Sequence, residues 1–272
     1  MTHEFSYHAP QSLDEALGLL AEFGKDAEVL SGGTDLLVGI RAGLSRPVHV
    51  VDIKRIDELN QLSFDKQDGL YIGATVTVNQ MLDYAPVVES FSVLKHAGEE
   101  LATHQLRHRA TPVGNIVTAS PCGDMSSPLL SLDAEVDIVS KEGSRRIPIQ
   151  DFITGVKQTA LQPNEIVRGV RVPTTWAGAN SGYKKLKRIK GHDLAVVSVA
   201  LIRNRTAMRV AISSAAPTPV LLPEFASNAS VQEVQDAAAG AISPIDDVRC
   251  TKEYRSFMVG VFIERLMNEV AA

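Results

Sequence analysis

The sequence predicts an α+β fold in which helices and strands alternate through most of the chain and a smaller unit follows. Three observations lead to this prediction. Apolar residues recur at helical spacing within residues 12–24, between a capping signal and a glycine. Strand-like runs at 27–30 and 48–53 flank a glycine turn and a short apolar helix. A small, turn-rich stretch at 176–182 marks a boundary, beyond which paired strands and amphipathic helices are expected.

The first part of the chain is expected to form a compact α/β unit. Ser12 and Glu15 have the spacing of a capping box, and Gly24 is a suitable helix end. The strand that follows leads into a glycine turn, after which residues 36–41 are predicted to form a short helix. Asp35 lies directly before that helix and is predicted to cap it.

The middle of the chain is predicted to combine short helices with strands. Thr77 opens one helix, and Asp124 is placed to cap another that runs through Leu132, with Pro128 in its first turn. The stretch 141–144 has the composition of a hairpin turn. The other elements expected here are a strand at 69–73, a helix near 92–102, strands at 134–140 and 145–149, and a strand at 165–172.

The last part of the chain is predicted to contain two strands, at 194–203 and 208–214, on either side of Asn204. Ser230 opens a helix, and a final amphipathic helix is expected from about Glu253. The residues predicted to face inward on that helix are Tyr254, Phe257, Met258, Val261, Phe262 and Leu266.

Composition excludes several classes of function. The chain has 272 residues, a net charge of −5 and 44% hydrophobic residues, which suffice for a sizeable core but give no basic surface for nucleic acid. No apolar run approaches the roughly 20 residues of a membrane span. The N-terminus lacks the basic start and apolar stretch of a signal peptide, so a cytoplasmic protein is expected.

The cysteines and histidines do not predict a metal site. Two cysteines, Cys122 and Cys250, cannot supply the four thiolates of an iron–sulfur cluster. His104 and His108 have helical i, i+4 spacing, but no acidic third ligand lies beside them. They are interpreted as surface or nucleotide-contacting residues.

Two glycine-bearing turns about eighty residues apart are the most informative feature. The first spans 30–37 and reads L-S-G-G-T-D-L-L, and the second spans 109–116 and continues to Asp124. Glycines let a backbone approach an anion closely, and successive N–H groups can form a nest for phosphate oxygens. Thr34 adds a hydroxyl donor. The two turns together suit a long anionic cofactor, although neither matches the G-x-G-x-x-G fingerprint.

With their flanks, the two turns resemble the flavin subunit of the molybdenum hydroxylases, the group of xanthine, carbon monoxide, nicotinate and aldehyde dehydrogenases. The resemblance extends over nearly the whole chain in the right order. The matching segments are G-G-T-D-L-L at 32–37, Q-L-R-H-R-A-T-P-V-G-N-I at 105–116, A-S-P-C-G-D at 119–124, L-L-S-L-D-A at 129–134, the lysine-rich run at 183–188, D-L-A at 193–195, D-V-R at 247–249 and Y-R at 254–255.

The resemblance implies that the protein binds FAD in an extended conformation. Two α/β subdomains, at 1–57 and 58–175, would grip the cofactor. A C-terminal domain at 180–272 would follow, with a three-stranded antiparallel sheet and a helical bundle. Because the flavin carries the chemistry, no catalytic side chain is expected.

The resemblance also implies contacts for individual residues. Ser31 to Asp35 and Thr111 to Asn115 would hold the pyrophosphate, and Leu161 would pack against the isoalloxazine unless it is ordinary core. Tyr183 would lie over a ring face and Lys185 near the polar edge of the flavin, although Lys185 belongs to a charged run that equally suits a solvated face. The residues expected to contact the cofactor are Leu30, Ser31, Gly32, Gly33, Thr34, Asp35, Leu36, Thr111, Gly114, Asn115, Ser120, Asp124, Leu161, Tyr183 and Lys185.

Three functions remain open at this point. The resemblance implies an oxidoreductase subunit that passes electrons from [2Fe–2S] clusters on a small partner, through FAD, to NAD⁺ or another acceptor. A molybdopterin-binding large subunit would oxidise the substrate. The alternatives are a flavin-free structural assembly subunit of the same complex and a stand-alone FAD reductase or oxidase.

Two residues depart from the family's pattern. Pro112 and Val113 stand where the family has I-G, and proline has no N–H to donate. A β-branched residue also resists a positive φ. The sequence therefore predicts one missing phosphate donor, and restoring I-G is expected to tighten FAD binding. Arg107 and Arg109 could serve the FAD phosphate, a partner or solvent.

Overall fold

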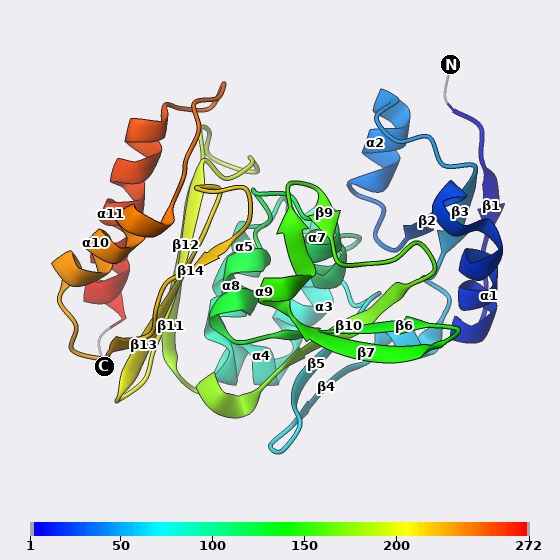
Figure 1. The fold of residues 1–272 in the computed structure, drawn as a ribbon. Coiled ribbons are helices and arrows are strands. Elements are labelled where there is room, and N and C mark those ends of the chain that lie inside the picture. The colour runs from blue at the N-terminus through cyan, green and yellow to red at the C-terminus, as the bar shows by residue number, and fades with distance from the viewer. Residues whose placement is uncertain (1–2, 271–272) are drawn as a thin grey trace.

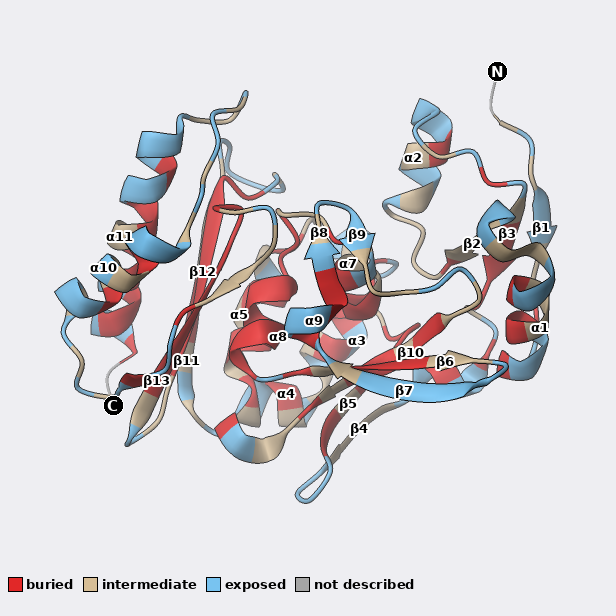
Figure 2. Cartoon of the chain, viewed as in Figure 1, coloured by how far each residue is buried: buried red, intermediate tan, exposed pale blue. Residues whose placement is uncertain are grey.

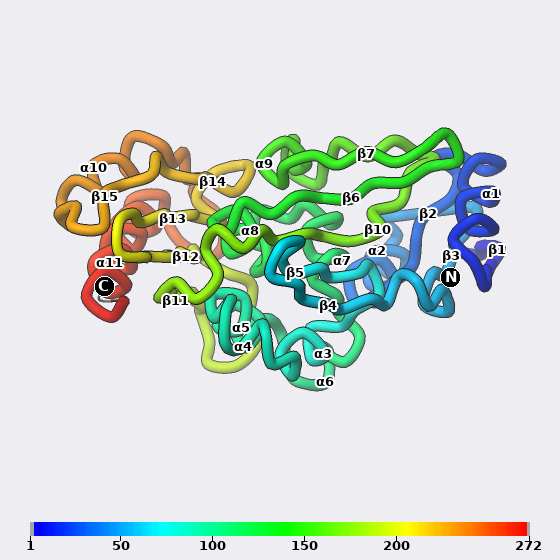
Figure 3. The backbone as a smooth tube through the Cα atoms, turned by 90° about the horizontal axis from the view of Figure 1, so that it is seen from below, coloured from blue at the N-terminus to red at the C-terminus, as the bar shows by residue number. Residues whose placement is uncertain are grey.

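The structure, a computed structural model, describes residues 3–270. It consists of three sheets that follow one another along the chain, with helices packed between and outside them (Figure 1). Seen from below, the N-terminal unit and the C-terminal helices lie at opposite ends, and the helices α3–α8 lie between them (Figure 3). The α+β class predicted from the sequence is confirmed.

The N-terminal unit is a three-stranded parallel sheet in the order β1-β3-β2. Its elements are β1 (Ser6–His8), α1 (Leu13–Phe23), β2 (Ala27–Leu30), α2 (Leu36–Ala42) and β3 (His49–Asp52). Helix α1 begins and ends where the sequence predicts, because Ser12 accepts a hydrogen bond from the Glu15 N–H. The Glu15 carboxylate accepts from Gln11 rather than from Ser12, so the capping box is not reciprocal.

The second sheet has five antiparallel strands in the order β4-β5-β10-β6-β7. The predicted hairpin is present as β6 and β7. Strand β4 was not predicted; it is short and lies at the edge of the sheet. The strands are β4 (Leu62–Asp65), β5 (Gly69–Gly73), β6 (Glu135–Ser140), β7 (Gly143–Pro148) and β10 (Ile166–Val172), with a separate pair formed by β8 (Ile153–Gly155) and β9 (Gln158–Thr159).

Short helices fill the long connection between β5 and β6. Helix α3 begins after Thr77 as predicted, and it has a capping box in which Thr77 and Gln80 bond each other's backbone N–H groups. The helices of this connection are α3 (Val78–Asp83), α4 (Ala85–Ser90), α5 (Ser92–Glu100), α6 (His104–Arg107), α7 (Pro112–Val117) and α8 (Ser126–Ser131). Helix α9 (Ile149–Phe152) follows β7, and the described residues include 3₁₀ turns at Gly24–Asp26, Asp57–Asn60 and Thr174–Trp176.

The third sheet is antiparallel and lies between two helical layers. Helices α5 and α8 cover one face, and α11 covers the other with α10 against it (Figure 1). The sheet contains the three strands that the resemblance implies and two further, very short ones. The elements are β11 (Asn180–Leu186), β12 (Val197–Arg203), β13 (Ala207–Ser213), β14 (Val220–Leu221), β15 (Phe225–Ala226), α10 (Val231–Ala241) and α11 (Lys252–Glu269).

Two large apolar cores follow from this layering, beside a small one of Leu30, Ile40 and Val50 in the N-terminal unit. The larger core begins in α1, runs through the second sheet and its helices, and reaches Ala200, Ile202 and Ala211 on the third sheet. The smaller core fills the space between the other face of that sheet and helices α10 and α11. Strand β12 is accordingly buried on both faces, whereas β7 is an exposed edge strand (Figure 2).

Helix α11 begins close to the predicted position, but its inward face is rotated from the predicted one. Met258, Phe262 and Leu266 are buried as predicted, whereas Tyr254 and Phe257 are exposed and stack on each other at the surface. The assignment of those two aromatic residues to the core is wrong. A second buried row, formed by Arg255, Val259, Ile263 and Met267, takes their place.

A buried charge cluster fastens the start of α11 to the preceding loop. The Asp247 carboxylate lies 2.6 Å from Arg249 and 3.0 Å from Arg255, whose side chain is 3% exposed. Arg255 also donates to the Ser214 carbonyl. Burial alone would raise the pKa of Asp247, but the hydrogen bonds from the two arginines outweigh it and hold the pKa well below its usual range.

Asp247→Asn is expected to lower the free energy of unfolding at pH 7 by about 1–3 kcal/mol, between the values for exposed and buried pairs. Because the folded-state pKa is depressed, this stabilisation is present above the unfolded pKa of about 4 and is lost as pH falls through the folded value. Urea unfolding at several pH values should show the difference from wild type shrinking below about pH 4. Asp236→Asn, on the exposed face of α10, is the matched control, and a difference independent of pH would contradict the assignment.

Candidate cofactor-binding site

A single cavity of about 530 Å³ brings the two glycine turns together. Residues from the N-terminal unit, from the helices of the second sheet and from a loop after β11 line it. The predicted residues at its wall are Ser31, Gly32, Gly33, Thr34, Asp35, Leu36, Thr111, Gly114, Asn115, Ser120, Asp124 and Leu161. The size is typical of a small-molecule site.

Glycines of the first turn are required by the backbone geometry around them. A Cβ on Gly32 would lie 2.0 Å from the Arg109 carbonyl oxygen, so the first turn can pack on the second only without a side chain there. Gly33 has a φ of +73°, which favours glycine. Ser31 donates from its hydroxyl to the Ala74 carbonyl at 2.9 Å, which ties the turn to the end of β5.

Asp35 occupies the predicted N-cap position of α2, but its side chain makes no capping hydrogen bond. Its carboxylate instead forms an ion pair with Lys157 at 3.3 Å. Both side chains are more than half exposed, so this pair contributes little to stability. The predicted capping role of Asp35 is wrong because a partner 122 positions away takes the carboxylate.

The second turn is the beginning of helix α7. Thr111 is its N-cap and accepts a hydrogen bond from the Gly114 N–H at 2.9 Å. Pro112 occupies the first helical position, where proline is favoured because its fixed φ suits the helix. Val113 is 2% exposed and helical, so no positive φ is needed. The expected conflict at Val113 is therefore absent, whereas the N–H that Pro112 lacks remains as support for a flavin-free subunit.

The loop after α7 is shaped by side chains that were predicted to touch the cofactor. Asn115 accepts the Met125 N–H at 3.0 Å, and Ser120 accepts the Cys122 N–H at 3.3 Å. Ala119 adopts a φ of +47°, an uncommon conformation for a residue with a side chain. These contacts hold the loop so that Asp124 faces the cavity.

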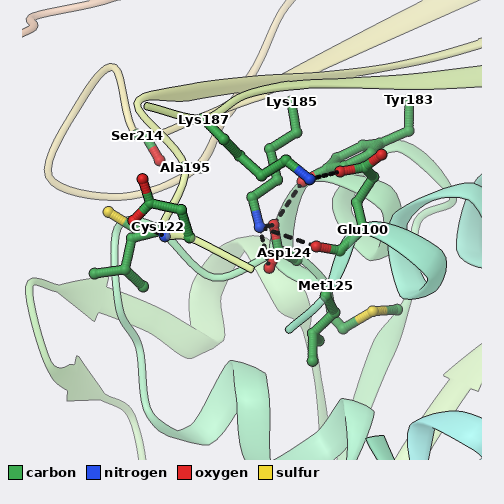
Figure 4. A network of polar contacts seen from close by, with 12 residues as sticks. Glu100, Cys122, Asp124, Met125, Tyr183, Lys185, Lys187, Ala195 and Ser214 are labelled. Atoms are coloured by element: carbon green, nitrogen blue, oxygen red, sulfur yellow. Dashed lines mark hydrogen bonds and ion pairs between the residues drawn. The ribbon is translucent and has the colours of Figure 1, made fainter. Parts of the chain in front are cut away.

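The prediction that Asp124 caps α8 is wrong. Asp124 lies instead in a buried polar network (Figure 4). Its carboxylate accepts from the Tyr183 hydroxyl at 3.0 Å and pairs with the Lys185 ammonium at 2.9 Å. Burial raises the pKa of Asp124, and Lys185 and Tyr183 oppose that shift without cancelling it. Burial also raises the pKa of Tyr183 well above its ordinary value, so its hydroxyl stays protonated.

Three predicted contact residues lie behind the cavity wall. Leu30 packs with Ile40 and Val50 in the core of the N-terminal unit. Tyr183 and Lys185 reach Asp124 from β11 but do not line the cavity. The expected positions of Tyr183 over a ring face and of Lys185 at the flavin edge stay predictions.

Several wall residues were not predicted. His192, Asp193 and Leu194 reach the cavity from the loop between β11 and β12, and Leu194 is 60% exposed. The D-L-A segment at 193–195 was part of the resemblance and was the available signal. Cys122 also lines the cavity and accepts a hydrogen bond from Arg249.

Arg107 and the two histidines near the second turn have structural partners. Arg107 donates to the Glu99 carbonyl at 2.5 Å and the Leu101 carbonyl at 3.1 Å, at the end of α5. The imidazole Nε2 atoms of His104 and His108 lie 3.1 Å apart. Within residues 3–270, no three His, Cys, Asp or Glu side chains gather as metal ligands would.

The residues at the cavity fit a dinucleotide. Small residues and hydroxyls from two turns suit phosphate oxygens, and a carboxylate suits sugar or ribityl hydroxyls. Apolar side chains from Leu101, Leu106, Leu161 and Leu194 can contact planar rings.

Comparison with known families agrees with this chemistry. A profile described as the FAD-binding domain in molybdopterin dehydrogenase matches residues 3–175. The chain belongs to this family. A second profile, the C-terminal domain of carbon monoxide dehydrogenase flavoproteins, matches residues 181–270 of this flavoprotein. The chain is thus a FAD-binding subunit of an oxidoreductase of the molybdenum hydroxylase group.

Similar proteins support the assignment over the full length of the flavoprotein. It is 31% identical to the carbon monoxide dehydrogenase medium chain of Hydrogenophaga pseudoflava, over 97% of this chain and 96% of the relative. It is 28% identical to a putative xanthine dehydrogenase FAD-binding subunit of Escherichia coli K12, over 98% and 96%. A solved carbon monoxide dehydrogenase from H. pseudoflava superposes with a TM-score of 0.92, at 31% identity and covering 99% of this chain and 98% of that one. In residues 3–270, no helix is long and apolar enough to cross a membrane.

Gly32→Ala is expected to weaken FAD binding and to destabilise the protein by about 1–3 kcal/mol, because its Cβ would overlap the Arg109 carbonyl. Gly39→Ala is the matched control. Gly39 lies inside α2 with only an ordinary contact to Ser45, so alanine should be neutral or stabilising by up to about 1 kcal/mol. Thermal unfolding and FAD titration measure both effects, and equal behaviour of the two variants would contradict the close approach.

The double substitution Pro112→Ile with Val113→Gly restores the family's pattern. In this structure it is expected to lower the free energy of unfolding rather than tighten FAD binding. Removing the buried Val113 side chain costs about 1.5–3 kcal/mol, and glycine in a helix costs up to about 1 kcal/mol more. Pro112→Ala alone separates the gain of a phosphate donor from the loss of packing at Val113, because it adds an N–H and leaves the Val113 side chain in place. Tighter FAD binding by the double variant would show that a phosphate donor is missing after all.

Proposed function

We propose that this flavoprotein is the electron-transfer subunit of a molybdenum hydroxylase, in which electrons from [2Fe–2S] clusters of a small partner leave through FAD to NAD⁺ or another acceptor. The observation that carries the proposal is the meeting of both glycine turns at one cavity that also contains the Asp124 carboxylate. FAD supplies the redox chemistry when bound. The chain's own task is to bind the cofactor, orient it and exclude water.

We further propose a division of the binding residues. Backbone and hydroxyl donors at 31–35 and 111–115 hold the pyrophosphate, since both stretches line the cavity. Ser120 and Asp124 form hydrogen bonds with the hydroxyls of the ribityl or ribose group. The Asp124 carboxylate accepts these bonds, and the Ser120 hydroxyl can donate or accept. Leu161 contacts the ring system. The assignment of 1–57 and 58–175 as cofactor-gripping subdomains, with 180–272 as a C-terminal domain, is part of the same proposal.

The partners are proposed from the names of relatives. The similar chain in H. pseudoflava is called a medium chain, which implies a larger and a smaller companion in that enzyme. A solved enzyme of the same organism is described as lacking the Mo-pyranopterin moiety of its molybdenum cofactor, and another solved enzyme as a Cu,Mo carbon monoxide dehydrogenase. By analogy we propose a molybdopterin-binding large subunit and a [2Fe–2S] small subunit for this flavoprotein, in the cytoplasm.

The chain purified alone should be yellow, and denaturation should release FAD into the supernatant. Protein that stays colourless after incubation with FAD would contradict the cofactor proposal. Expression with its neighbouring reading frames tests the assembly. Co-purification with polypeptides that carry iron, sulfide and molybdenum is expected, whereas a yellow chain that reduces an acceptor on its own would favour a stand-alone FAD reductase.

A further inference from the structure

The ammonium group of Lys185 is buried against Asp124. Its side chain is 1% exposed, and Nζ lies 2.9 Å from each carboxylate oxygen of Asp124 and 3.1 Å from the Glu100 carbonyl. Of its three N–H donors, one points at the Asp124 carboxylate and one at the Glu100 carbonyl. Lys185 is not among the residues that line the cavity, so its contact with the site runs through Asp124.

Asp124 is the member of this network that faces the cavity. It lines the cavity wall, and its carboxylate contacts the Tyr183 hydroxyl and the Lys185 ammonium, neither of which lines the cavity (Figure 4). An ionised carboxylate offers about four acceptor positions, so some remain for a ligand. A protonated carboxyl would lose part of that capacity.

The charges around Asp124 decide which form is present. Burial favours the neutral acid, and Lys185 is the cation in contact with the carboxylate. Glu100, on α5, opposes ionisation, but Lys187 pairs with its carboxylate at 2.6 Å. Tyr183 remains protonated and donates a hydrogen bond to Asp124. Without the Lys185 cation, the carboxylate would be a buried charge with only a phenol to stabilise it.

We propose that Lys185 is a positioning residue for the cofactor: from behind the cavity wall, it keeps Asp124 ionised and fixed so that this carboxylate can accept hydrogen bonds from hydroxyl groups of FAD. The proposal rests on the proposed function, because it requires FAD in the cavity. It gives Lys185 a role that acts through Asp124 and excludes direct contact with the flavin.

The first test compares Lys185→Met with Lys184→Met in the full chain. Lys184 is the neighbouring residue on β11 and pairs with Glu269 at the surface, so its variant controls for loss of a lysine from the strand. At pH 7, Lys185→Met should weaken FAD binding about ten- to hundredfold, the factor for one charge-assisted hydrogen bond. Lys184→Met should bind like wild type. Equal binding by all three proteins would overturn the proposal.

The pH profile separates this role from a general loss of packing. In Lys185→Met, only the fraction of chains with ionised Asp124 should bind well, so FAD affinity should rise with pH by up to about tenfold per unit. Wild type and Lys185→Arg, which keeps a cation, should depend less on pH than Lys185→Met. A flat profile for Lys185→Met would overturn the proposal.

A double-mutant cycle tests whether Lys185 acts through Asp124. Asp124→Asn should weaken FAD binding, and adding Lys185→Met to it should cause little further loss. The double variant contains no buried charge at this site, so it tests the proposal even if Lys185→Met alone fails to fold. Additive losses would mean that Lys185 contacts FAD itself. If Asp124→Asn binds FAD normally, this inference fails while the FAD site stands; if wild type binds no FAD, the proposed function fails.

Discussion

The buried carboxylate of Asp124 is the point at which the parts of this molecule meet. Asp124 belongs to the loop after α7, and its two partners, Tyr183 and Lys185, come from β11. Lys185 also donates to the Glu100 carbonyl at the end of α5. A carboxylate in such a place costs free energy unless charged or hydroxyl groups surround it. The position of the third sheet relative to the cavity is thereby coupled to the state of a single acidic group.

A second constraint is the contact between the two turns. The absence of a side chain at Gly32 lets the first turn lie directly on the Arg109 carbonyl, and the cavity exists where these backbones diverge. The parallel sheet of the N-terminal unit and the antiparallel second sheet are thus joined at a site of small residues. Rigid packing on both sides leaves a defined space between them, as a cofactor site requires.

Local signals in the sequence were sufficient for much of the fold. The hydrogen bonds at Ser12, Thr77 and Ser230 are short-range, and helices α1, α3 and α10 begin where those residues predict. Strand β11 was missed because Asn180-Ser181-Gly182 resembles a turn. Its extended form depends on pairing with β12 and on α11, whose Leu266 lies so close to Gly182 that a Cβ would not fit.

The cofactor site was predictable as a set of turns, and less so as a set of side-chain roles. Asp35 and Asp124 both stand before helices and look like caps, but each finds a cation far away in the sequence. Lys185 looked like a flavin contact because the sequence does not reveal that Asp124 lies between it and the cavity. Partners that are distant in sequence determine these roles, and no local pattern encodes them.

The bond from Arg249 to Cys122 has a consequence for how the protein is made. The two residues are 127 positions apart, and Ser214, which bonds the Pro121 carbonyl, follows that residue by 93. Translation at about 5–20 residues per second exposes the cavity loop roughly 6–25 s before Arg249 is synthesised. During that interval the N-terminal two sheets can fold, but the rear of the cavity lacks its final support. The cavity with Arg249 behind Cys122 is therefore complete only after most of the chain has been synthesised.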